Sequence, residues 1–600
     1  MQLHLRTSVA ASYQNRIVLA FALLNEAKHP RTGFLATAWN DTKGMLGITP
    51  SFCHAERSEA STHGIPHRVR NDKHEMLGMR YSGGIAKPTR SYSLVLLFSL
   101  CFFLPHLLFA QPEPLRFREL LPAALTRPTS QVSAPSVVPN EIVIKFKPSL
   151  SPSAFSTLQA ACISARPSTL RFGNFSIANA TLLPLTPNTL GKATKTLQMA
   201  RLREVDRIAV LRLEKKVSAA ELEQLVLLLS QDPNVEYASR VHLLSLDSDW
   251  YASSSSGTHA PPISPHDSHN WQVPNDSAYR SQWNLAKIQA ETAWQFTKGD
   301  PAILIGIIDT GIDYTHPDLA PKLFVKPAED RNRNGTFEPW DFRERRNPQT
   351  FELDPNGITG DFDGIDQDGN GYPDDIIGWD FTDQPFNNDA LNGFSDFQFP
   401  DPDPFDDNSH GTACAGIAAA ATNNRIGIAG VAPNCKLVAL RVFTGAGGYG
   451  GDYASDKDIA SALIYAADNG IRVVNMSFGD VVASPVMRDA VKYAYSKGVV
   501  MCASAGNAGG EQQRYPAGYD EVIATAATTR FDEITPFSTR GFRVDLAAPG
   551  EAIVTTYPFY RRFYSATFGG TSAAAAHATG AAALVLSQNP RLSPEQVRGI

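Results

Sequence analysis

Three residues of the sequence could together make a hydroxyl group nucleophilic. Asp309 ends the apolar run AILIGIID, His410 lies in NSHGTACAG, and Ser572 lies in FGGTSAAAAH. A serine hydroxyl is a poor nucleophile until a neutral imidazole takes its proton. The imidazole in turn needs a carboxylate that fixes its tautomer and stabilises its charged form. Alone, each residue would more often be a turn, core or capping residue. Together, among small residues that let a substrate backbone approach, they predict acyl-transfer chemistry.

Other residues fit these roles less well. His577 follows Ser572 by five positions, which places it about 140° further around a helix. We therefore expect His577 to face away from Ser572. Asp313 and His316 lie in the turn after Asp309 and have no apolar strand of their own to hold them.

The elements that must position the three residues are visible from about residue 275 onward. Short, fully apolar runs alternate with helical segments: AILIGIID, KLVALRVF, IRVVNMSF, GVVMCASAG and EVIATAAT are the runs. Such runs are typical of strands in a parallel sheet covered on both faces. SDKDIASALIYAADNG and SPVMRDAVKYAYSKG lie between consecutive runs and predict crossover helices. We predict an α/β fold, a doubly wound and mostly parallel sheet with helices on both faces, and catalytic groups at the carboxyl ends of its strands.

Four motifs of this region resemble those of the subtilisin-like serine proteases, or subtilases. They are DTGID at Asp309, NSHGTACAG at His410, SAGN at Asn507 and GGTSAAAAH at Ser572, in the order Asp, His, Ser that marks subtilisin among serine hydrolases. The resemblance spans about 275–600. It implies a serine endopeptidase in which Ser572 is the nucleophile, His410 the general base and acid, and Asp309 the orienting carboxylate.

The resemblance also implies the surroundings of the reacting bond. The side-chain amide of Asn507 and the backbone N–H of Ser572 would form the oxyanion hole. Loss of such an asparagine costs about 10²–10³ in turnover, a magnitude that comes from subtilisin itself. The backbone segments implied for substrate binding, which could equally be ordinary core strands, are Ser477, Phe478, Gly479, Ala503, Ser504, Ala505 and Gly506.

The sequence departs from the family pattern just after the nucleophile. Ala573 and Ala576 stand where the family usually has Met and Pro. Without the proline, the first helical turn could shift and loosen the oxyanion geometry. Two alternatives therefore stay open: a weakly active or inactive binding protein with a subtilase fold, and an esterase or amidase on the same scaffold.

The strongest charge feature lies between Asp309 and His410. Residues 352–407 contain 16 Asp or Glu and no Lys or Arg. The region could be a solvated acidic loop, but oxygen-rich side chains at alternate positions of a turn are what calcium requires. We therefore predict structural calcium. The expected ligands are Asp366, Asp368, Asn370, the Tyr372 carbonyl and Asp374 in one loop, and Asp330, Asn332, Asn334, Glu338 and Asp341 in another.

The N-terminal part contains one apolar stretch long enough for a membrane. SYSLVLLFSLCFFLPHLLFA, residues 91–110, follows Lys87 and Arg90 and ends in a small residue, as secretory signal peptides do. Because a signal belongs at a chain start, Met79 is the expected initiator. Residues 1–78 would then be untranslated or unstructured, 79–110 the signal peptide and 111–137 a linker.

A small α+β domain is predicted between residues 138 and 246. EIVIKFK reads as a strand, Ser218 and Glu221 form a capping box before a helix, and NVEYASRVHLLSL reads as a closing strand. The resemblance implies that this domain is an inhibitory propeptide, which the enzyme removes by cutting within the 247–274 linker. The catalytic domain, 275–600, ends two turns into a helix, so we expect it to continue.

Composition excludes several other classes of protein. The net charge is −6, whereas a nucleic-acid-binding protein would normally carry a basic excess. Six cysteines in 600 residues are too few for a disulfide scaffold. We expect a secreted enzyme that acts on protein or peptide substrates, with its own propeptide as inhibitor, no nucleic-acid partner and no stable membrane span after signal cleavage.

Overall fold

The computed structural model describes residues 137–149, 160–162, 164, 166–172, 175–187, 203–246, 273–338, 361–383, 399–443, 453–559 and 563–600. Residues 1–78, the expected signal peptide and nearly all of both expected linkers lie outside these ranges. Asp341, one of the expected calcium ligands, does so too. No helix in the described ranges is long and apolar enough to cross a bilayer.

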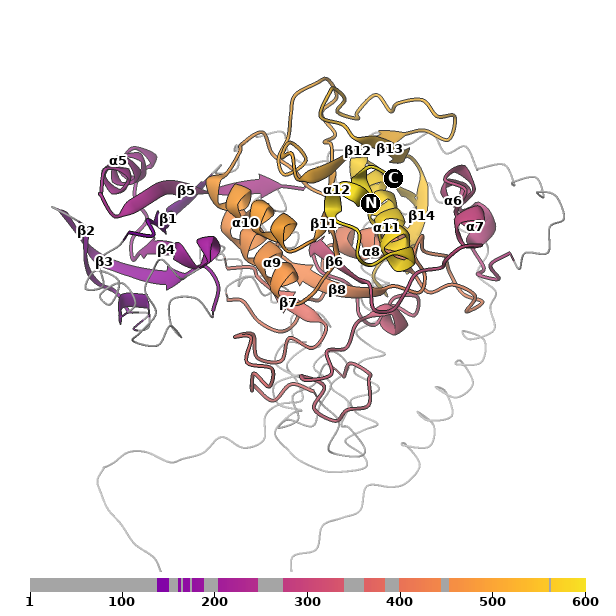
Figure 1. Cartoon of the computed structure of the whole chain (residues 1–600), viewed down its shortest axis with the longest axis horizontal. Helices are drawn as coiled ribbons and strands as arrows, with labels where there is room; N and C mark the ends of the chain where they lie inside the picture. The colour runs from indigo at the N-terminus through magenta and orange to yellow at the C-terminus, as the bar shows by residue number, and fades with distance from the viewer. Residues whose placement is uncertain are drawn as a thin grey trace, which may run out of the picture. The chain divides into compact units, whose positions relative to one another are not determined.

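The larger region is built on a seven-stranded sheet whose neighbouring strands all pair in parallel (Figure 1). In spatial order the strands are β13 (Leu546–Pro549), β12 (Val522–Thr528), β11 (Val500–Ser504), β10 (Val473–Met476), β6 (Leu304–Asp309), β8 (Lys436–Arg441) and β7 (Gly378–Asp380). The inner strands β6, β10 and β11 are buried throughout, which explains why their sequences are continuously apolar. The predicted parallel sheet is confirmed.

Two pairs of helices cover the two faces of this sheet. Helices α8 (His410–Ala419) and α11 (Thr571–Gln588) pack together on one face, and α9 (Asp456–Asp468) and α10 (Pro485–Ser496) on the other. Side chains of a strand alternate between faces: Ile305 and Ile307 join the core under α8 and α11, whereas Leu304 and Ile308 join the core under α9 and α10. The doubly wound arrangement is therefore confirmed.

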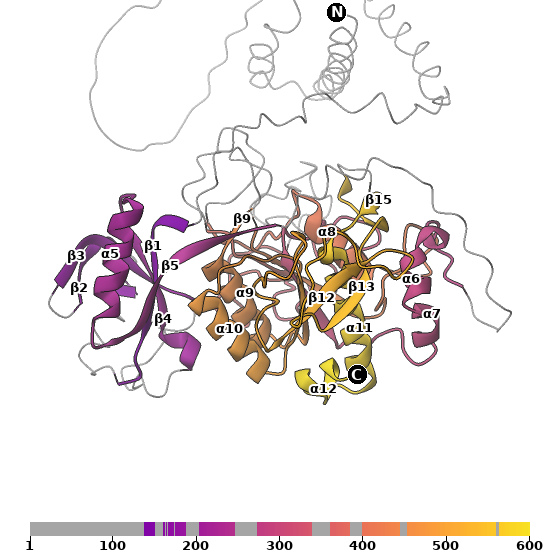
Figure 2. The same cartoon turned by 90° about the horizontal axis from the view of Figure 1, so that it is seen from above.

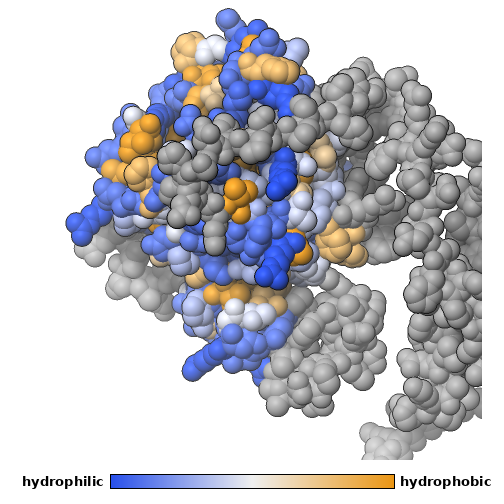
Figure 3. Space-filling view, turned by 90° about the vertical axis from the view of Figure 1, so that its right-hand side faces the viewer, coloured by the Kyte–Doolittle hydropathy of each residue, from blue (hydrophilic) through white to orange (hydrophobic). Residues whose placement is uncertain are grey.

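Shorter elements complete the larger region (Figure 2). Helices α6 (Trp283–Lys287) and α7 (Ala290–Ala293) precede β6, and α12 (Pro594–Arg598) follows α11. Strands β14 (Ile553–Thr556) and β15 (Tyr564–Phe568) form an antiparallel pair before α11. On the face drawn in Figure 3, apolar side chains appear only in small, separate groups among hydrophilic ones.

The N-terminal region forms a second, antiparallel sheet. Its strands are β1 (Val137–Phe146), β2 (Ser168–Phe172), β3 (Phe175–Pro184), β4 (Ile208–Leu213) and β5 (Val235–Ser245), in the order β2-β3-β4-β1-β5. Helix α5 (Ala219–Ser230) packs on one face, over Ile142 and Ile144, and begins with the predicted capping box of Ser218 and Glu221. The other face packs against α9 and α10, where Val143 joins their core. A sixth strand, β9 (Tyr453–Ser455), extends this sheet from the larger region.

Candidate active site

Strand β6 and helix α8 bring Asp309 and His410 into contact. Asp309 is the last residue of β6 and His410 the first of α8, and His410 Nδ1 donates a hydrogen bond of 2.7 Å to Asp309 Oδ1. Both residues are buried. Burial lowers the pKa of His410, but the negative charge of Asp309 outweighs burial and leaves that pKa well above its ordinary value. The bond fixes the proton on Nδ1, so that Nε2 is the nitrogen left to act as a base.

Small residues allow this approach. A Cβ atom on Gly411 would lie 2.1 Å from the carbonyl oxygen of Gly311, so only glycine lets α8 begin against the turn that follows β6. Cys414 lies one turn after His410, with its Sγ 4.0 Å from His410 Nδ1. Asp309, His410 and Cys414 are close enough to share a metal ion, and burial raises the pKa of the Cys414 thiol, which disfavours its thiolate form.

A buried carboxylate that the sequence analysis missed ties the two elements together. Asp406 accepts at least five hydrogen bonds. One comes from the Thr310 hydroxyl, which directly follows Asp309, at 2.9 Å. The others come from the two residues before α8 and from its first turn, including Ser409 N and Thr412 N, both at 2.8 Å. Burial raises the pKa of Asp406 to about 6. Its only signal in the sequence is an acid just before a helix, a common capping arrangement.

The opposite side of the site is the first turn of α11, which carries Ser572. The Ser572 hydroxyl donates to the backbone oxygen of Ser477 at 3.2 Å, and the Ser477 hydroxyl donates to the backbone oxygen of Ser572 at 3.0 Å. Among the hydrogen bonds of the described residues, none joins Ser572 to His410. In enzymes without substrate, catalytic hydrogen bonds of this kind are often long or unformed.

Behind Ser477, a chain of neutral side chains leads back to α11. The Asn475 amide donates to the Ser477 hydroxyl at 2.9 Å, and the Thr579 hydroxyl donates to Asn475 Oδ1 at 3.1 Å. All of these side chains are buried. Neither Asn475 nor Thr579 was predicted from the sequence, because both look like ordinary residues of an apolar strand and an alanine-rich helix.

Asn507 lies beside the same helical turn. Its Oδ1 accepts hydrogen bonds from Thr571 N at 2.8 Å and from the Thr571 hydroxyl at 2.9 Å, which orients the amide and leaves Nδ2 as a donor. Gly570 has a φ of +98°, and a Cβ there would lie 3.1 Å from Asn507 Nδ2, so glycine at this position leaves space beside the amide. With alanine instead of the family's usual proline at position 576, the helix still runs unbroken from Thr571 to Gln588.

His577 occupies a separate, neutral environment. It is fully buried, its Nδ1 donates to the Ala573 carbonyl at 2.7 Å, and its Nε2 accepts from the Asn284 amide at 2.8 Å. Burial lowers its pKa to about 4. His577 therefore faces away from Ser572, as expected.

The first expected substrate-binding segment follows β10, and the second begins with the last two residues of β11; the two strands pair through Met476 and Ala503. Ser477 and Phe478 are buried, as are the residues from 503 to 506. Gly506 N donates to the Thr571 hydroxyl at 3.1 Å, so both segments reach the first turn of α11. Arg514 lies between them: its Nη1 donates to the Gly479 carbonyl at 3.2 Å.

The two expected calcium loops share one hydrogen-bonding pattern. In the first loop, Gly335 N donates to Asp330 at 2.7 Å and Asn334 N donates to Asn332 at 2.9 Å. The equivalent bonds of the second loop run from Gly371 N to Asp366 and from Asn370 N to Asp368, both at 2.8 Å. In the first loop, the side-chain amides of both asparagines also donate to Glu338.

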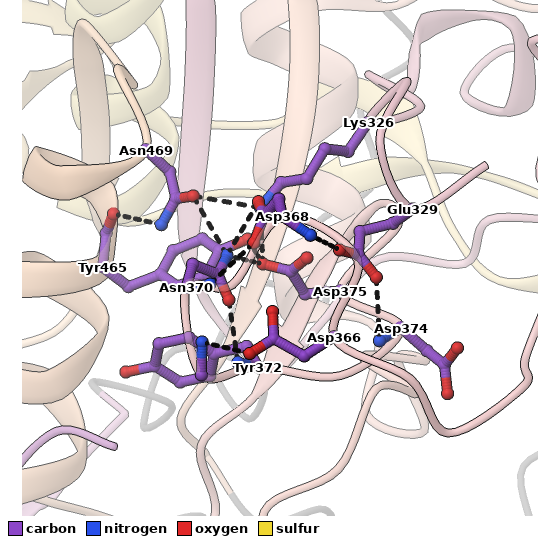
Figure 4. Close-up of polar contacts among 11 residues, drawn as sticks. Lys326, Glu329, Asp366, Asp368, Asn370, Tyr372, Asp374, Asp375, Tyr465 and Asn469 are labelled. Atoms are coloured by element: carbon purple, nitrogen blue, oxygen red, sulfur yellow. Dashed lines mark hydrogen bonds and ion pairs between the residues drawn. The ribbon is translucent and has the colours of Figure 1, made fainter. Parts of the chain in front are cut away.

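Figure 4 shows which carboxylates of the second loop converge. Oxygens of Asp366, Asp368 and Glu329 lie within 4.8 Å of one another. Glu329 was not predicted: it is buried, and it accepts from the backbone N–H groups of Asp368 and Asp374. The Asp374 carboxylate, a predicted ligand, instead accepts from the backbone of Asp363 and Gly364.

A cation already lies on one side of this cluster. Lys326 Nζ contacts Asp375 at 2.6 Å, Asn469 at 3.0 Å and Asp368 at 3.1 Å. Asp368 is thus shared between the lysine and the group of three carboxylates. The oxygens of Glu329 and Asp366 remain suited to a hard cation.

Comparison with known proteins agrees with this geometry. The model of the subtilase family matches residues 300–600. The thermophilic serine proteinase of Bacillus sp. (strain AK1) is 33% identical over 373 residues, which cover 62% of this chain and 68% of that protein. Thermitase of Thermoactinomyces vulgaris is 36% identical over 317 residues, 53% of this chain and 86% of thermitase. Subtilisin DY of Bacillus licheniformis is 42% identical over 197 residues, 32% of this chain and 69% of that protein.

The fold and the comparisons together define a serine-type endopeptidase, an enzyme that acts on peptides. The chain belongs to the subtilase family.

Proposed function

We propose that this chain is a secreted endopeptidase that cleaves peptide bonds through an acyl-enzyme on Ser572. The observation that supports this most directly is the 2.7 Å bond between His410 Nδ1 and Asp309 Oδ1, buried at the carboxyl end of β6. Such a pair fixes the tautomer of a base that can activate a nucleophile. Ser572, on the first turn of α11, is the nucleophile.

The reaction begins when the Ser572 hydroxyl exchanges its bond to Ser477 for one to His410. As Ser572 Oγ attacks the substrate carbonyl carbon, its proton passes to His410 Nε2, and Asp309 stabilises the resulting imidazolium. Asn507 Nδ2 and Ser572 N–H donate to the oxygen that becomes negative. His410 then gives the proton to the departing amine. Water then takes the place of the amine and attacks the acyl carbon while its proton passes to His410. His410 returns that proton to Ser572 Oγ as the acyl group leaves.

Substitution of the nucleophile tests this proposal. Ser572→Ala is expected to abolish casein hydrolysis and labelling by a fluorophosphonate probe. Ser587→Ala, on the same helix, is the matched control and should retain both. Casein hydrolysis by Ser572→Ala at the rate of the unaltered enzyme would refute the mechanism. If the unaltered enzyme is labelled by the probe but cleaves no protein substrate, an esterase is favoured. If the unaltered enzyme is not labelled, a binding protein is favoured.

We propose that the N-terminal domain, predicted as residues 138–246, is the inhibitory propeptide. Its last strand supports this, because Leu243, Leu244 and Ser245 pair antiparallel with β9 of the larger region. The expected cut lies within the 247–274 linker. N-terminal sequencing of protein recovered from the culture medium tests both secretion and the position of the cut. Ser572→Ala should remain uncut, and processing of that variant at the normal rate would exclude self-cleavage.

We propose calcium as a structural cofactor of the two acidic loops. The oxygens of Glu329, Asp366 and Asp368 fit a hard cation, which would supply only electrostatic cross-linking of the loop. A ligand at 100 times its dissociation constant stabilises a fold by about 2.7 kcal/mol. EGTA should therefore lower the melting temperature. Asp366→Asn should remove that EGTA effect, and the exposed control Glu511→Gln should preserve it. An unchanged melting temperature in EGTA would exclude the cofactor.

A further inference from the structure

Four charged side chains close a ring between the N-terminal domain and the larger region. Arg212 of β4 contacts Glu141 of β1 at 2.6 Å and also pairs with Asp383. Lys457 of α9 contacts Asp383 at 3.3 Å and Glu141 at 3.7 Å. The signs alternate around the ring, so every neighbouring pair attracts. We call these four residues the charge ring.

The charge ring is shielded from solvent. The side-chain exposure is 0% for Glu141, 5% for Lys457, 17% for Asp383 and 23% for Arg212. Burial raises the pKa of Asp383, but the charges of Lys457 and Arg212 outweigh it and hold that pKa below its ordinary value. Burial lowers the pKa of Lys457, and the acids around it raise it more. Salt screens such partly buried pairs much less than it screens surface pairs.

Each side of the interface contributes one acid and one base to the charge ring. The N-terminal domain contributes Glu141 and Arg212, and the larger region contributes Asp383 and Lys457. When the two parts separate, Glu141 keeps Arg212, while Lys457 keeps Asp383 and also Asp458, 2.9 Å away. Neither part is left with an orphaned charge, so separation is feasible. What is lost is the pairing of opposite charges across the interface, Arg212 with Asp383 and Lys457 with Glu141.

We propose that the charge ring selects this chain's own N-terminal domain as the partner bound against α9. This inference rests on the proposed propeptide function. A domain with the same fold but the opposite order of acid and base would place a base against Lys457 and an acid against Asp383. Like charges that are desolvated together oppose binding strongly. The ring therefore contributes affinity for this N-terminal domain and also lowers the affinity for a domain with the opposite order of charges.

The apolar contacts around the charge ring add affinity but discriminate less between partner domains. Val143, Val241 and Leu244 of the N-terminal domain pack into the core that includes α9 and α10. Apolar burial of this kind is not directional.

The order of the charges in the ring is directional. Two simpler ion pairs also cross the interface, Lys145 with Asp489 at 3.0 Å and Arg203 with Asp468 at 2.7 Å, and in both the larger region supplies only the acid. The ring, to which each side supplies an acid and a base, is therefore where a partner with the opposite order of charges is rejected.

The test uses the full chain with Ser572→Ala, so that no self-cleavage occurs. A recognition site for a sequence-specific protease is placed within residues 251–272, and the two parts are separated after the nick by gel filtration in 0.15 M salt, about physiological ionic strength. Glu141→Arg combined with Arg212→Glu keeps the internal pair of the N-terminal domain but reverses both contacts across the interface. We expect dissociation about 10²-fold faster than for the unaltered chain. Glu223→Gln, in the exposed pair with Arg240, is the control and should have no effect.

A second set of variants separates binding from folding. Arg212→Met, Asp383→Asn and their combination form a double-mutant cycle, and Asp383→Asn leaves the N-terminal domain untouched. We expect the two effects to be coupled by about tenfold. Dissociation of the reversed variant within about threefold of the unaltered chain, or a cycle without coupling, would overturn the proposal. Because Ser572 is absent throughout, neither result depends on whether Ser572 is the nucleophile.

Discussion

The two sides of the candidate active site hold their residues in place by different means. On the side of β6 and α8, two buried carboxylates, Asp309 and Asp406, bind His410 and the backbone around it. On the side of β10 and α11, a neutral chain of Thr579, Asn475 and Ser477 ends at the backbone of Ser572. The difference shows where charge is useful. A carboxylate must be present where a proton will arrive, whereas a nucleophile needs only a fixed position.

The two buried histidines illustrate the same contrast. His410 lies beside a carboxylate, which outweighs burial and raises its pKa. His577 lies between a carbonyl and an amide, and burial lowers its pKa to about 4. One histidine is therefore prepared to accept a proton and the other is held neutral. Substitution of each histidine in turn tests the contrast.

The largest difference should separate the two histidines. His410→Gln removes the proposed general base, and kcat is expected to fall by about 10²–10⁴-fold. His577→Gln is the matched control and should change kcat by less than about tenfold, because Gln can still bond to Asn284 or Ala573. Casein hydrolysis at fixed enzyme concentration measures both. Equal losses in the two variants would show that the assignment of roles is wrong.

The carboxylate that joins the two elements should have the next largest effect. Asp406→Asn replaces one acceptor oxygen with a donor facing other donors, which should displace Thr310 or the start of α8. We expect kcat to fall by about 10- to 100-fold with little change in KM, because misplacement of catalytic groups affects the rate more than binding. Asp407→Asn, beside it in the sequence and paired with Arg441, is the control. If both variants retain full kcat, Asp406 does not position the pair.

Acid should lower the stability of the fold through His577, which lies on the neutral side of the site. Its pKa is about 4 in the folded state and 6.5 in the unfolded chain, so the unfolded chain binds more protons between these values. The stabilisation is complete above pH 6.5 and is lost as pH falls toward 4. A shift of this size corresponds to about 3 kcal/mol. Urea unfolding of the Ser572→Ala chain at several pH values measures this loss. His577→Gln should reduce the dependence on pH; an unchanged dependence would assign acid sensitivity to other groups.

The smallest effect is expected at the far end of the neutral chain. Thr579→Val keeps the shape of the side chain but removes its bond to Asn475. One neutral hydrogen bond contributes about 1 kcal/mol, so kcat should fall by about fivefold or less. Thr525→Val is the control, since that buried hydroxyl has no hydrogen-bond partner in the described structure. A loss as large as that of Asp406→Asn would mean that the nucleophile depends on its neutral chain as strongly as the base depends on its carboxylates.

Local patterns made much of this molecule predictable. The apolar runs predicted the parallel sheet because strands buried on both faces have few polar positions. The Ser218 capping box predicted the start of α5, because all its bonds lie within four residues. The motifs around Asp309 and His410 predicted two residues that lie 2.7 Å apart, at the end of β6 and the start of α8. The role of Ser572, on the first turn of α11, stays a prediction.

Contacts between distant segments were not predictable in the same way. Glu329 approaches Asp368 only after 39 residues of chain have folded back, and Lys457 meets Glu141 from the opposite domain. Asp406 looked like one more acid of the acidic run, although it is buried and bonds to the site. No periodicity or spacing reveals such partners, because they are set by how loops and domains pack.

The pairing of β5 with β9 has a consequence for protein handling. While the N-terminal domain is attached, the backbone groups of β9 that face β5 are occupied. If that domain is removed, β9 loses its pairing with β5, and backbone groups released in this way can pair with another chain. Because β9 spans only Tyr453–Ser455, the exposed edge is short, which limits that hazard. Concentrated stocks should therefore store best with both parts still associated.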